Sequence, residues 1–366
     1  MEYQPPSSNR KLRFIYMAIS LISTTGSSLF LKLQNKETSY GLPYNHPFIQ
    51  CILMNCGQLL CLYTDIIISK WYPNPPEYDA NGKQKIQCPA HVYAIPALCD
   101  TIGSSCYAFG LVLCALSITQ IMGSLLIVGS ALISSFYLHR KLHSHHILSL
   151  VLIFCGIVLS GVAILLFDKE KGDRDETSIV GILLLLFGYI VWSIQSVAEE
   201  KIFTVYQSSP LRAIGFEGLN GLIFNSTLTL IFSFVSCSPI YSGKSKTSGM
   251  CIYNVIENPG MALIQIYKNK ALLWECIGYV LITSFVNVSI IAVVKYGSAI
   301  HTCIIFNMRT VTLWAISILF KWEYFIWLEL VAFLGLVLLG ALIYNEILVI
   351  PWFGLNKNLE KANKLK

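Results

Sequence analysis

Ten long apolar runs, separated by short polar segments, dominate the chain. They cover residues 12–31, 47–69, 91–113, 116–138, 146–167, 178–202, 211–236, 272–294, 299–320 and 324–346. Each run is about 20 residues long, the length that an α-helix needs to cross a hydrocarbon core of roughly 30 Å. Unpaired backbone groups are costly in hydrocarbon, and the runs lack the alternation of barrel strands. The pattern therefore predicts an all-α, polytopic membrane protein with ten transmembrane helices.

The fifth and tenth runs contain related sequences. FCGIVLSGVAIL, residues 154–165, matches FLGLVLLGALIY, residues 333–344, at six of twelve positions. The offset of 179 residues is half the chain, which indicates duplication of a five-helix unit, a pattern typical of transporter folds. Because five is odd, the second unit must enter the membrane in the opposite orientation. We therefore expect two inverted five-helix repeats with a substrate cavity between them near mid-depth.

The polar segments set the expected boundaries. The first repeat covers 1–167, a polar connecting loop (DKEKGDRDET) covers 168–177, the second repeat covers 178–346, and a polar C-terminal tail covers 347–366. The longest loop, 237–271, contains MALIQIYKN, which predicts an amphipathic helix at the membrane interface and not a span.

Composition excludes an ordinary water-soluble globule, because 55% of the 366 residues are hydrophobic and only 13% are charged. The net charge of +6 is interpreted as a topology signal. With both termini on the cytoplasmic (or matrix) side, inner segments carry fifteen Lys and Arg and outer segments carry ten, which favours this orientation. The positive charges form no stripe with interleaved aromatics, so we expect no nucleic-acid partner. The expected partner is the lipid bilayer.

The first run is too long for a cleaved signal peptide. The sequence leaves the organelle open between Golgi or lysosomal endomembrane and the mitochondrial inner membrane.

Motifs for metal binding or enzyme chemistry are absent from the sequence. Eight of the twelve cysteines lie within predicted spans and no C-x-x-C occurs, so they are interpreted as small packing residues. Cys237 and Cys251 share an outer loop and could pair in an oxidising lumen. The histidines of HRKLHSHH, residues 139–146, belong to a basic inner loop that is interpreted as a topology signal and not as a metal site. Without a nucleophile elbow, phosphate loop or H-E-x-x-H, we expect no enzyme activity and no cofactor.

Polar side chains inside the predicted spans are the candidate substrate-binding or coupling residues. They are Asp100, Gln120, Glu217, Asn287 and Arg309. A charge inside the bilayer is expensive, so each one needs a partner or a wet cavity. Asp100 and Arg309 lie nine and ten residues into their spans, roughly 14 Å deep at 1.5 Å per residue and hence near the midplane. They either form a mutual or local ion pair that fixes helix packing, or they contact a substrate.

The other three candidates also have two interpretations. Glu217 lies in GFEGLNG, where flanking glycines let another helix or a ligand come close, and it could carry a proton. Gln120 and Asn287 either add neutral hydrogen-bonding groups to the cavity or join neighbouring helices. Outside this set, Gly156 with Gly161 and Gly335 with Gly340 suit close packing of the fifth and tenth helices, in a repeat interface or a dimer.

Five segments agree in order and spacing with a known family. They are NHPFIQ (45–50), IPALCDTIGSS (95–105), VAEEKIF (197–203), PLRAIGFEGL (210–219) and MRTVTLWAISILFKWE (308–323). In these segments the chain resembles the solute carrier 35 family, subfamily F, within the EamA-like drug/metabolite transporter superfamily. The resemblance implies ten helices, inverted five-helix repeats and alternating access for nucleotide sugars or other metabolites.

The chain departs from the family pattern at three positions where a charge is expected. Gly123 stands where an arginine would fall, Phe306 replaces an acid, and Gln58 replaces a glutamate. These changes remove groups that would hold an anionic or zwitterionic substrate.

Two functions from different classes are therefore expected. The first is a secondary-active, alternating-access transporter of a small metabolite, a nucleotide sugar or another organic solute. In it, Arg309 attracts an anionic group and Glu217 or Asp100 takes up a proton or a substrate amine. The second is a transporter-fold structural subunit of a larger membrane assembly, which could be mitochondrial. A homodimer is a further expectation from the family.

Overall fold

The structure is a computed structural model, in which a subset of the chain is described. It describes residues 10–39, 41–72, 78, 84–137, 142–167, 178–236, 255–296, 299–322, 326–344 and 348. Several segments discussed above lie outside the described residues: Cys237 and Cys251, whose pairing the sequence leaves open, His139, the connecting loop 168–177, and the tail 347–366 apart from Leu348.

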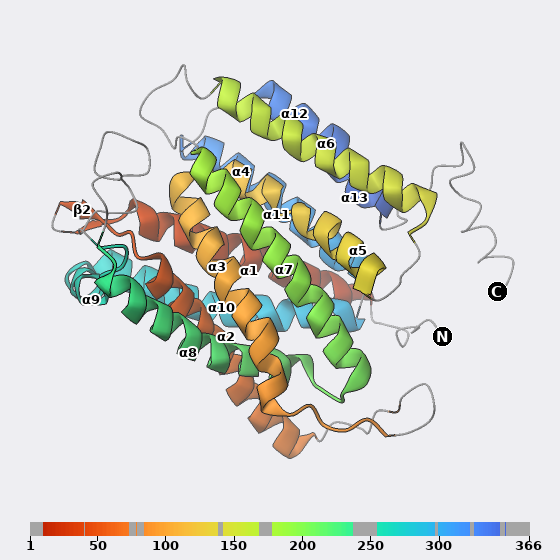
Figure 1. The fold of residues 1–366 in the computed structure, drawn as a ribbon, viewed down its shortest axis with the longest axis horizontal. Coiled ribbons are helices and arrows are strands. Elements are labelled where there is room, and N and C mark those ends of the chain that lie inside the picture. Colours follow the sequence, from red (N-terminus) through yellow and green to blue (C-terminus); the bar gives the residue numbers. More distant parts are fainter. Residues whose placement is uncertain are drawn as a thin grey trace, which may run out of the picture.

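Helices make up almost all of the described structure (Figure 1). In chain order they are α1 (Arg10–Lys36), α2 (Pro47–Trp71), a 3-10 turn (Ala90–Tyr93), α3 (Ala94–Leu113), α4 (Leu116–Met122), α5 (Leu125–Tyr137), α6 (Ser144–Phe167), α7 (Ile179–Val205), α8 (Pro210–Phe234), α9 (Pro259–Lys268), α10 (Lys270–Tyr296), α11 (Ala299–Leu319), α12 (Trp327–Ala332), a π-helical turn (Phe333–Leu338) and α13 (Leu339–Tyr344). Between α1 and α2, the short strands β1 (Thr38–Ser39) and β2 (Leu42–Pro43) form an antiparallel hairpin, with Thr38 opposite Pro43 and Ser39 opposite Leu42.

All ten predicted runs are helical where the structure describes them, so the all-α prediction is confirmed. Within the described residues, seven helices are long and apolar enough to cross a membrane: Phe14–Lys36, Pro47–Trp71, Ala90–Leu113, Ile118–Tyr137, Ser144–Ala163, Ile179–Phe203 and Lys270–Ile290. The seventh predicted run is α8, whose Glu217 and two asparagines lower its hydropathy. The ninth and tenth runs contain shorter apolar helices. Ten spans in two inverted repeats therefore stay a prediction.

Pairs of helices distant in sequence build the bundle. α2 packs on α8, α3 on α7, and α1 on α10, while α6 packs along α12 and α13 at one margin of the molecule (Figure 1). The α2–α8 pair is close because Gly215, Gly218 and Gly221 face α2, where added side chains would meet Leu62, Gln58 and Asn55 respectively. Their spacing of three residues places them in one stripe of α8.

The packing of α6 on α12 and α13 tests the prediction that the four glycines of the repeated sequence permit close helix contact. A side chain at Gly156 would meet Leu336 and Val337, and one at Gly340 would meet Ser149 and Ile153, so these two glycines permit close packing. A side chain at Gly161 or Gly335 would meet nothing within 4 Å. The fifth and tenth predicted helices do pack together, but one glycine of each pair makes the contact.

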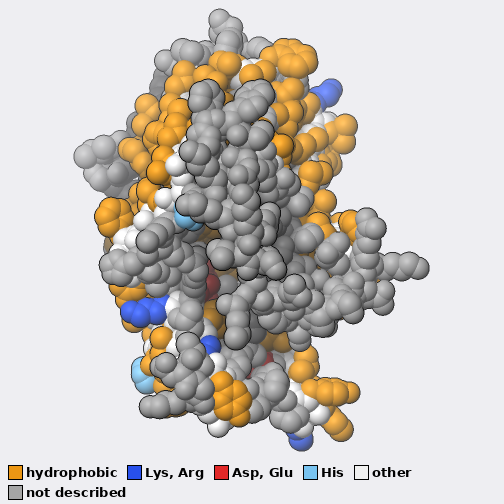
Figure 2. All heavy atoms as spheres, turned by 90° about the vertical axis from the view of Figure 1, so that its right-hand side faces the viewer, with side chains coloured by type: hydrophobic (Ala, Val, Ile, Leu, Met, Phe, Trp, Pro, Cys, Tyr) orange, Lys and Arg blue, Asp and Glu red, His pale blue; other side chains and the backbone are white. Residues whose placement is uncertain are grey.

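The surface and interior suit a membrane environment. Large apolar side chains such as Ile22, Phe234 and Trp274 are 70%, 81% and 69% exposed. Figure 2 shows one face of the molecule, where hydrophobic side chains cover much of the described surface. Several buried hydroxyls donate within their own helices, as where Thr24 and Thr229 each donate at 2.7 Å to the carbonyl four residues earlier.

Candidate functional site

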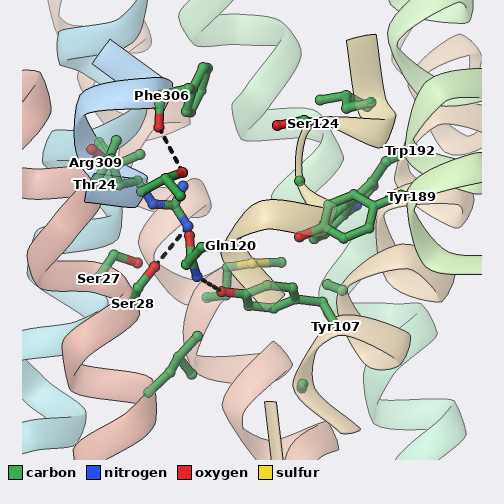
Figure 3. Close-up of a pocket in the computed structure, with 18 of the residues that line it drawn as sticks. Thr24, Ser27, Ser28, Tyr107, Gln120, Ser124, Tyr189, Trp192, Phe306 and Arg309 are labelled. Atoms are coloured by element: carbon green, nitrogen blue, oxygen red, sulfur yellow. Dashed lines mark hydrogen bonds between the residues drawn. The ribbon is translucent and has the colours of Figure 1, made fainter. Parts of the chain in front are cut away.

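A cavity of about 580 Å³ lies in the middle of the bundle (Figure 3). Its described lining comes from α1, α2, α3, α4, α5, α7, α10, α11 and α13. Small hydroxyl groups line it, namely those of Thr24, Ser27, Ser28, Ser104, Ser124, Ser130 and Thr310. Aromatic rings also line it, those of Tyr107, Tyr189, Trp192, Tyr279, Phe306 and Tyr344. The volume and the mixed lining suit a small organic molecule.

Arg309 of α11 is the only charged side chain among the described residues that line the cavity. Its Nη2 donates a 2.8 Å hydrogen bond to Oγ of Ser28 on α1, and its Nε is buried with no hydrogen-bond partner in the described structure. Figure 3 shows the guanidinium next to Thr24, Ser27 and Ser28 and pointing toward the side of the cavity that holds Gln120. No described carboxylate forms an ion pair with it. A guanidinium with unused donors in a cavity is suited to bind an anion.

Gln120 lies on the short helix α4, which packs on α11, and Figure 3 shows its side chain between the Arg309 guanidinium and the Tyr107 hydroxyl. Its Nε2 donates to the hydroxyl of Tyr107 at 3.0 Å. The rings of Tyr107 and Tyr189 flank Trp192, with centroids 5.6 and 5.4 Å from it. The hydroxyl of Tyr189 donates to the Thr119 carbonyl at 2.8 Å, which holds this aromatic wall against α4. Such a wall can stack on a planar group.

Asp100 of α3 lies behind the aromatic wall and does not line the cavity. Its two carboxylate oxygens accept hydrogen bonds from Nε2 of Gln58 and Nε1 of Trp192, both at 3.2 Å. Asp100 and Arg309 therefore have separate neutral partners, and the mutual ion pair that the sequence left open is not formed. Trp192 connects Asp100 to the cavity, since it touches both.

Glu217 and Asn287 also lie away from the cavity lining. Nε2 of Gln195 donates to Glu199 at 2.7 Å and to Glu217 at 3.4 Å, so two glutamates of α7 and α8 share one amide group. The glycines beside Glu217 admit α2, and no ligand contact is needed to explain them. The Asn287 amide donates to the Thr283 carbonyl of its own helix at 3.0 Å.

The three departures from the family pattern meet at this site. Gly123 and Phe306 line the cavity, and Gln58 donates to Asp100 directly behind it. Glycine and phenylalanine contribute no charge, so Arg309 sets the sign of the described lining. The cavity is thus more apolar than one carrying all the charges that the family resemblance implies.

Sequence reasoning did not identify Ser28, Tyr107, Tyr189 or Trp192 as site residues. A signal exists for two of them, because Tyr189 and Trp192 are three residues apart on one face of an apolar helix. Hydroxyl and aromatic residues are common in transmembrane helices, however, and only the packing shows which of them face a cavity. In the described part of the chain, no group of three or more His, Cys, Asp or Glu side chains could hold a metal ion.

The fold and the site define an all-α polytopic membrane protein with a central polar and aromatic cavity. Residues 15–244 match the family model for solute carrier family 35, SLC35F. The match covers more than half of the chain, and the protein belongs to this family, whose members are typically transporters and not enzymes.

Matches to individual proteins extend over most of the chain. Solute carrier family 35 member F6 of Rattus norvegicus and of Homo sapiens are each 28% identical over 302 residues, covering 82% of this chain and 78% of theirs. An uncharacterized protein of Schizosaccharomyces pombe is 29% identical over 261 residues, covering 70% of this chain and 75% of its own. A solved structure titled "Crystal structure of protein" covers 92% of this chain and 96% of its own at 13% identity, with a TM-score of 0.46.

Proposed function

We propose that the protein is a secondary-active carrier that moves a small organic anion across a membrane by alternating access. The observation that supports this most is Arg309, the single charged side chain of the described cavity lining, which has no carboxylate partner there. A buried cation is costly unless something compensates it, and an anionic solute is the natural compensation. A nucleotide sugar is one solute of this class.

The aromatic wall and the hydroxyl groups of the cavity supply further contacts to the solute. A planar part of the solute stacks against Tyr107, Tyr189 and Trp192, while Gln120 and the serines of α1 hydrogen-bond to its polar groups. In the proposed cycle, one five-helix repeat rocks against the other around this cavity. Asp100 is better placed than Glu217 to take up a coupling proton or a substrate amine, because its partner Trp192 lines the cavity.

Reconstitution into liposomes tests the proposal, with a panel of radiolabelled organic anions and matched neutral solutes. We expect anion uptake, loss of at least about 90% of it in Arg309→Ala because one charge-assisted contact is worth roughly 1.5–3 kcal/mol, and partial retention in Arg309→Lys. Arg212→Ala is the matched control, since Arg212 lies on α8 over the Phe216 ring and away from the cavity lining. Equal uptake in all variants would contradict the proposal.

A second candidate function is that of a structural subunit in a larger membrane assembly. The observation that favours it is the loss of expected charges at Gly123, Phe306 and Gln58, which leaves the described cavity lining with a single charged side chain. Mild-detergent native electrophoresis of the source membranes, followed by mass spectrometry, separates the two. Migration as a monomer or dimer favours the carrier, and stoichiometric migration with a large complex favours the subunit.

A further inference from the structure

Beyond the cavity, a group of buried polar residues joins distant parts of the chain at the end of the bundle that carries the β1–β2 hairpin. His46, directly before α2, is fully buried, and Glu257, just before α9, is 1% exposed. Nδ1 of His46 lies 2.5 Å from Oε1 of Glu257, and Nε2 of His46 lies 3.1 Å from Oε1 of Gln265 on α9. We name His46, Glu257 and Gln265 the hairpin-end clasp.

Gln265 links the His46 ring to the β1–β2 hairpin. Nε2 of Gln265 donates toward the carbonyls of Ser39 and Leu42 in the hairpin, at 3.4 and 3.5 Å, so its amide oxygen must be the atom that faces His46. Both ring nitrogens of His46 therefore face an oxygen atom, and the ring joins the Glu257 carboxyl group to the Gln265 amide of α9.

The carboxylate of Glu257 joins the start of α2 to the segment before α9. In addition to the His46 ring, its oxygens accept from the backbone N–H of Phe48, in the first turn of α2, and of Asn258, both at 3.1 Å. A carboxylate at the N-terminus of a long helix is further favoured by the helix dipole. One side chain of the second half thus caps α2 of the first half.

The clasp lies one helical turn from the cavity. Gln50 lines the cavity, and its backbone N–H donates to the His46 carbonyl at 3.0 Å. The Gln50 side chain donates to Gln34 and Asn35 at the end of α1, at 3.1 and 2.7 Å. Moving outward from the cavity, the first layer is therefore Gln50 with the end of α1, and the second layer is the clasp.

We propose that the hairpin-end clasp is the gate that keeps this end of the cavity closed, and that separation of His46 from Glu257 opens it. A buried carboxyl group with several hydrogen bonds suits a two-state contact, because it is stable when all its partners are in place and unfavourable when they are removed. The contact of His46 with Glu257 also joins the loop that precedes α2 to the segment that precedes α9, which belong to different halves of the chain. Relative movement of the halves must break it.

Native Cys51 provides the test, because it lines the cavity next to Gln50 and is only 3% exposed. Sealed proteoliposomes are selected in which an N-terminal tag is protected from protease, so that the hairpin end faces the bath. A membrane-impermeant thiol reagent is added, and modification of Cys51 is measured by peptide mass spectrometry. In Glu257→Gln we expect the Cys51 rate to rise by about tenfold or more over the unaltered protein. The labelling needs no solute, so its result is independent of what the cavity transports.

Two references within the same experiment separate opening from unfolding. Cys61 lies ten residues further along α2 and is 1% exposed, so its rate should stay unchanged in Glu257→Gln. Glu37→Gln is the control variant, because Glu37 accepts from Asn269 at the same end of the bundle at 2.8 Å without touching the clasp. Unchanged Cys51 labelling in a folded Glu257→Gln protein would overturn the proposal.

Hydrogen–deuterium exchange of the unaltered protein tests the clasp should Glu257→Gln fail to fold. Because one carboxylate holds the N–H groups of Phe48 and Asn258, the peptides covering 44–50 and 255–262 should open together at one slow rate. Independent rates for the two peptides would show that no single clasp joins them.

Discussion

At the residue scale, Arg309 and Asp100 show how well a residue's depth along a predicted helix predicts its place in a site. The sequence placed both near the midplane, and the structure gives Arg309 to the cavity and Asp100 to a pocket of neutral donors behind it. Depth can be counted in residues along a helix, but the direction of a side chain changes by about 100° per residue. Gln120 and Arg309 face the cavity, whereas Glu217 and Asn287, at equally predictable depths, do not line it.

Asp100 offers a prediction at this scale. Asp100→Leu leaves the donors of Gln58 and Trp192 without an acceptor, and each buried unpaired donor costs about 1–3 kcal/mol. Asp100→Asn retains one acceptor oxygen and should cost less. In thermal unfolding in detergent, the melting temperature should be highest for the unaltered protein, lower for Asp100→Asn and lowest for Asp100→Leu. Equal melting temperatures for the two variants would show that these hydrogen bonds do not stabilise the fold.

At the element scale, the helices were predictable and their interruptions were not. Long apolar runs must be helical in a bilayer, which accounts for the agreement over all ten. The fourth run is divided into α4 and α5 near Gly123, and the tenth contains the π-helical turn Phe333–Leu338. The matching residues of α6 are α-helical. Gly335, within the π-helical turn, has nothing within 4 Å, although Gly156, its counterpart in α6, meets Leu336 and Val337.

The glycine stripe of α8 leads to an element-scale prediction. A side chain at Gly218 would meet the Gln58 side chain and the backbone of α2, so Gly218→Leu must push α8 away from α2. Overpacking of this kind costs about 1–3 kcal/mol or more. Gly161→Leu is the matched control, because Gly161 is also in a helix and has nothing within 4 Å. Unfolding in detergent should show a lower midpoint for Gly218→Leu alone, and similar midpoints would mean that the α2–α8 contact is loose.

At the scale of the whole molecule, the number of spans decides the topology. Seven described helices meet the length and hydropathy of a span, whereas the apolar runs and the repeat predict ten. An even number puts both termini on one side, and an odd number puts them on opposite sides. We expect N-terminal and C-terminal tags to be accessible to protease from the same, cytoplasmic side of sealed vesicles. Tags on opposite sides would exclude the pair of inverted five-helix repeats.

The solitary charge of the cavity has a consequence for energetics at this scale. A carrier whose empty site bears one positive charge is neutral there once a monoanion is bound. Movement of a unit charge through a membrane potential is worth about 2.3 kcal/mol per 100 mV, so the voltage would act on the return of the empty carrier and not on the loaded step. By retaining Arg309 while three neighbouring positions lack the expected charges, the protein would draw on the electrical gradient during the half of its cycle in which it transports nothing.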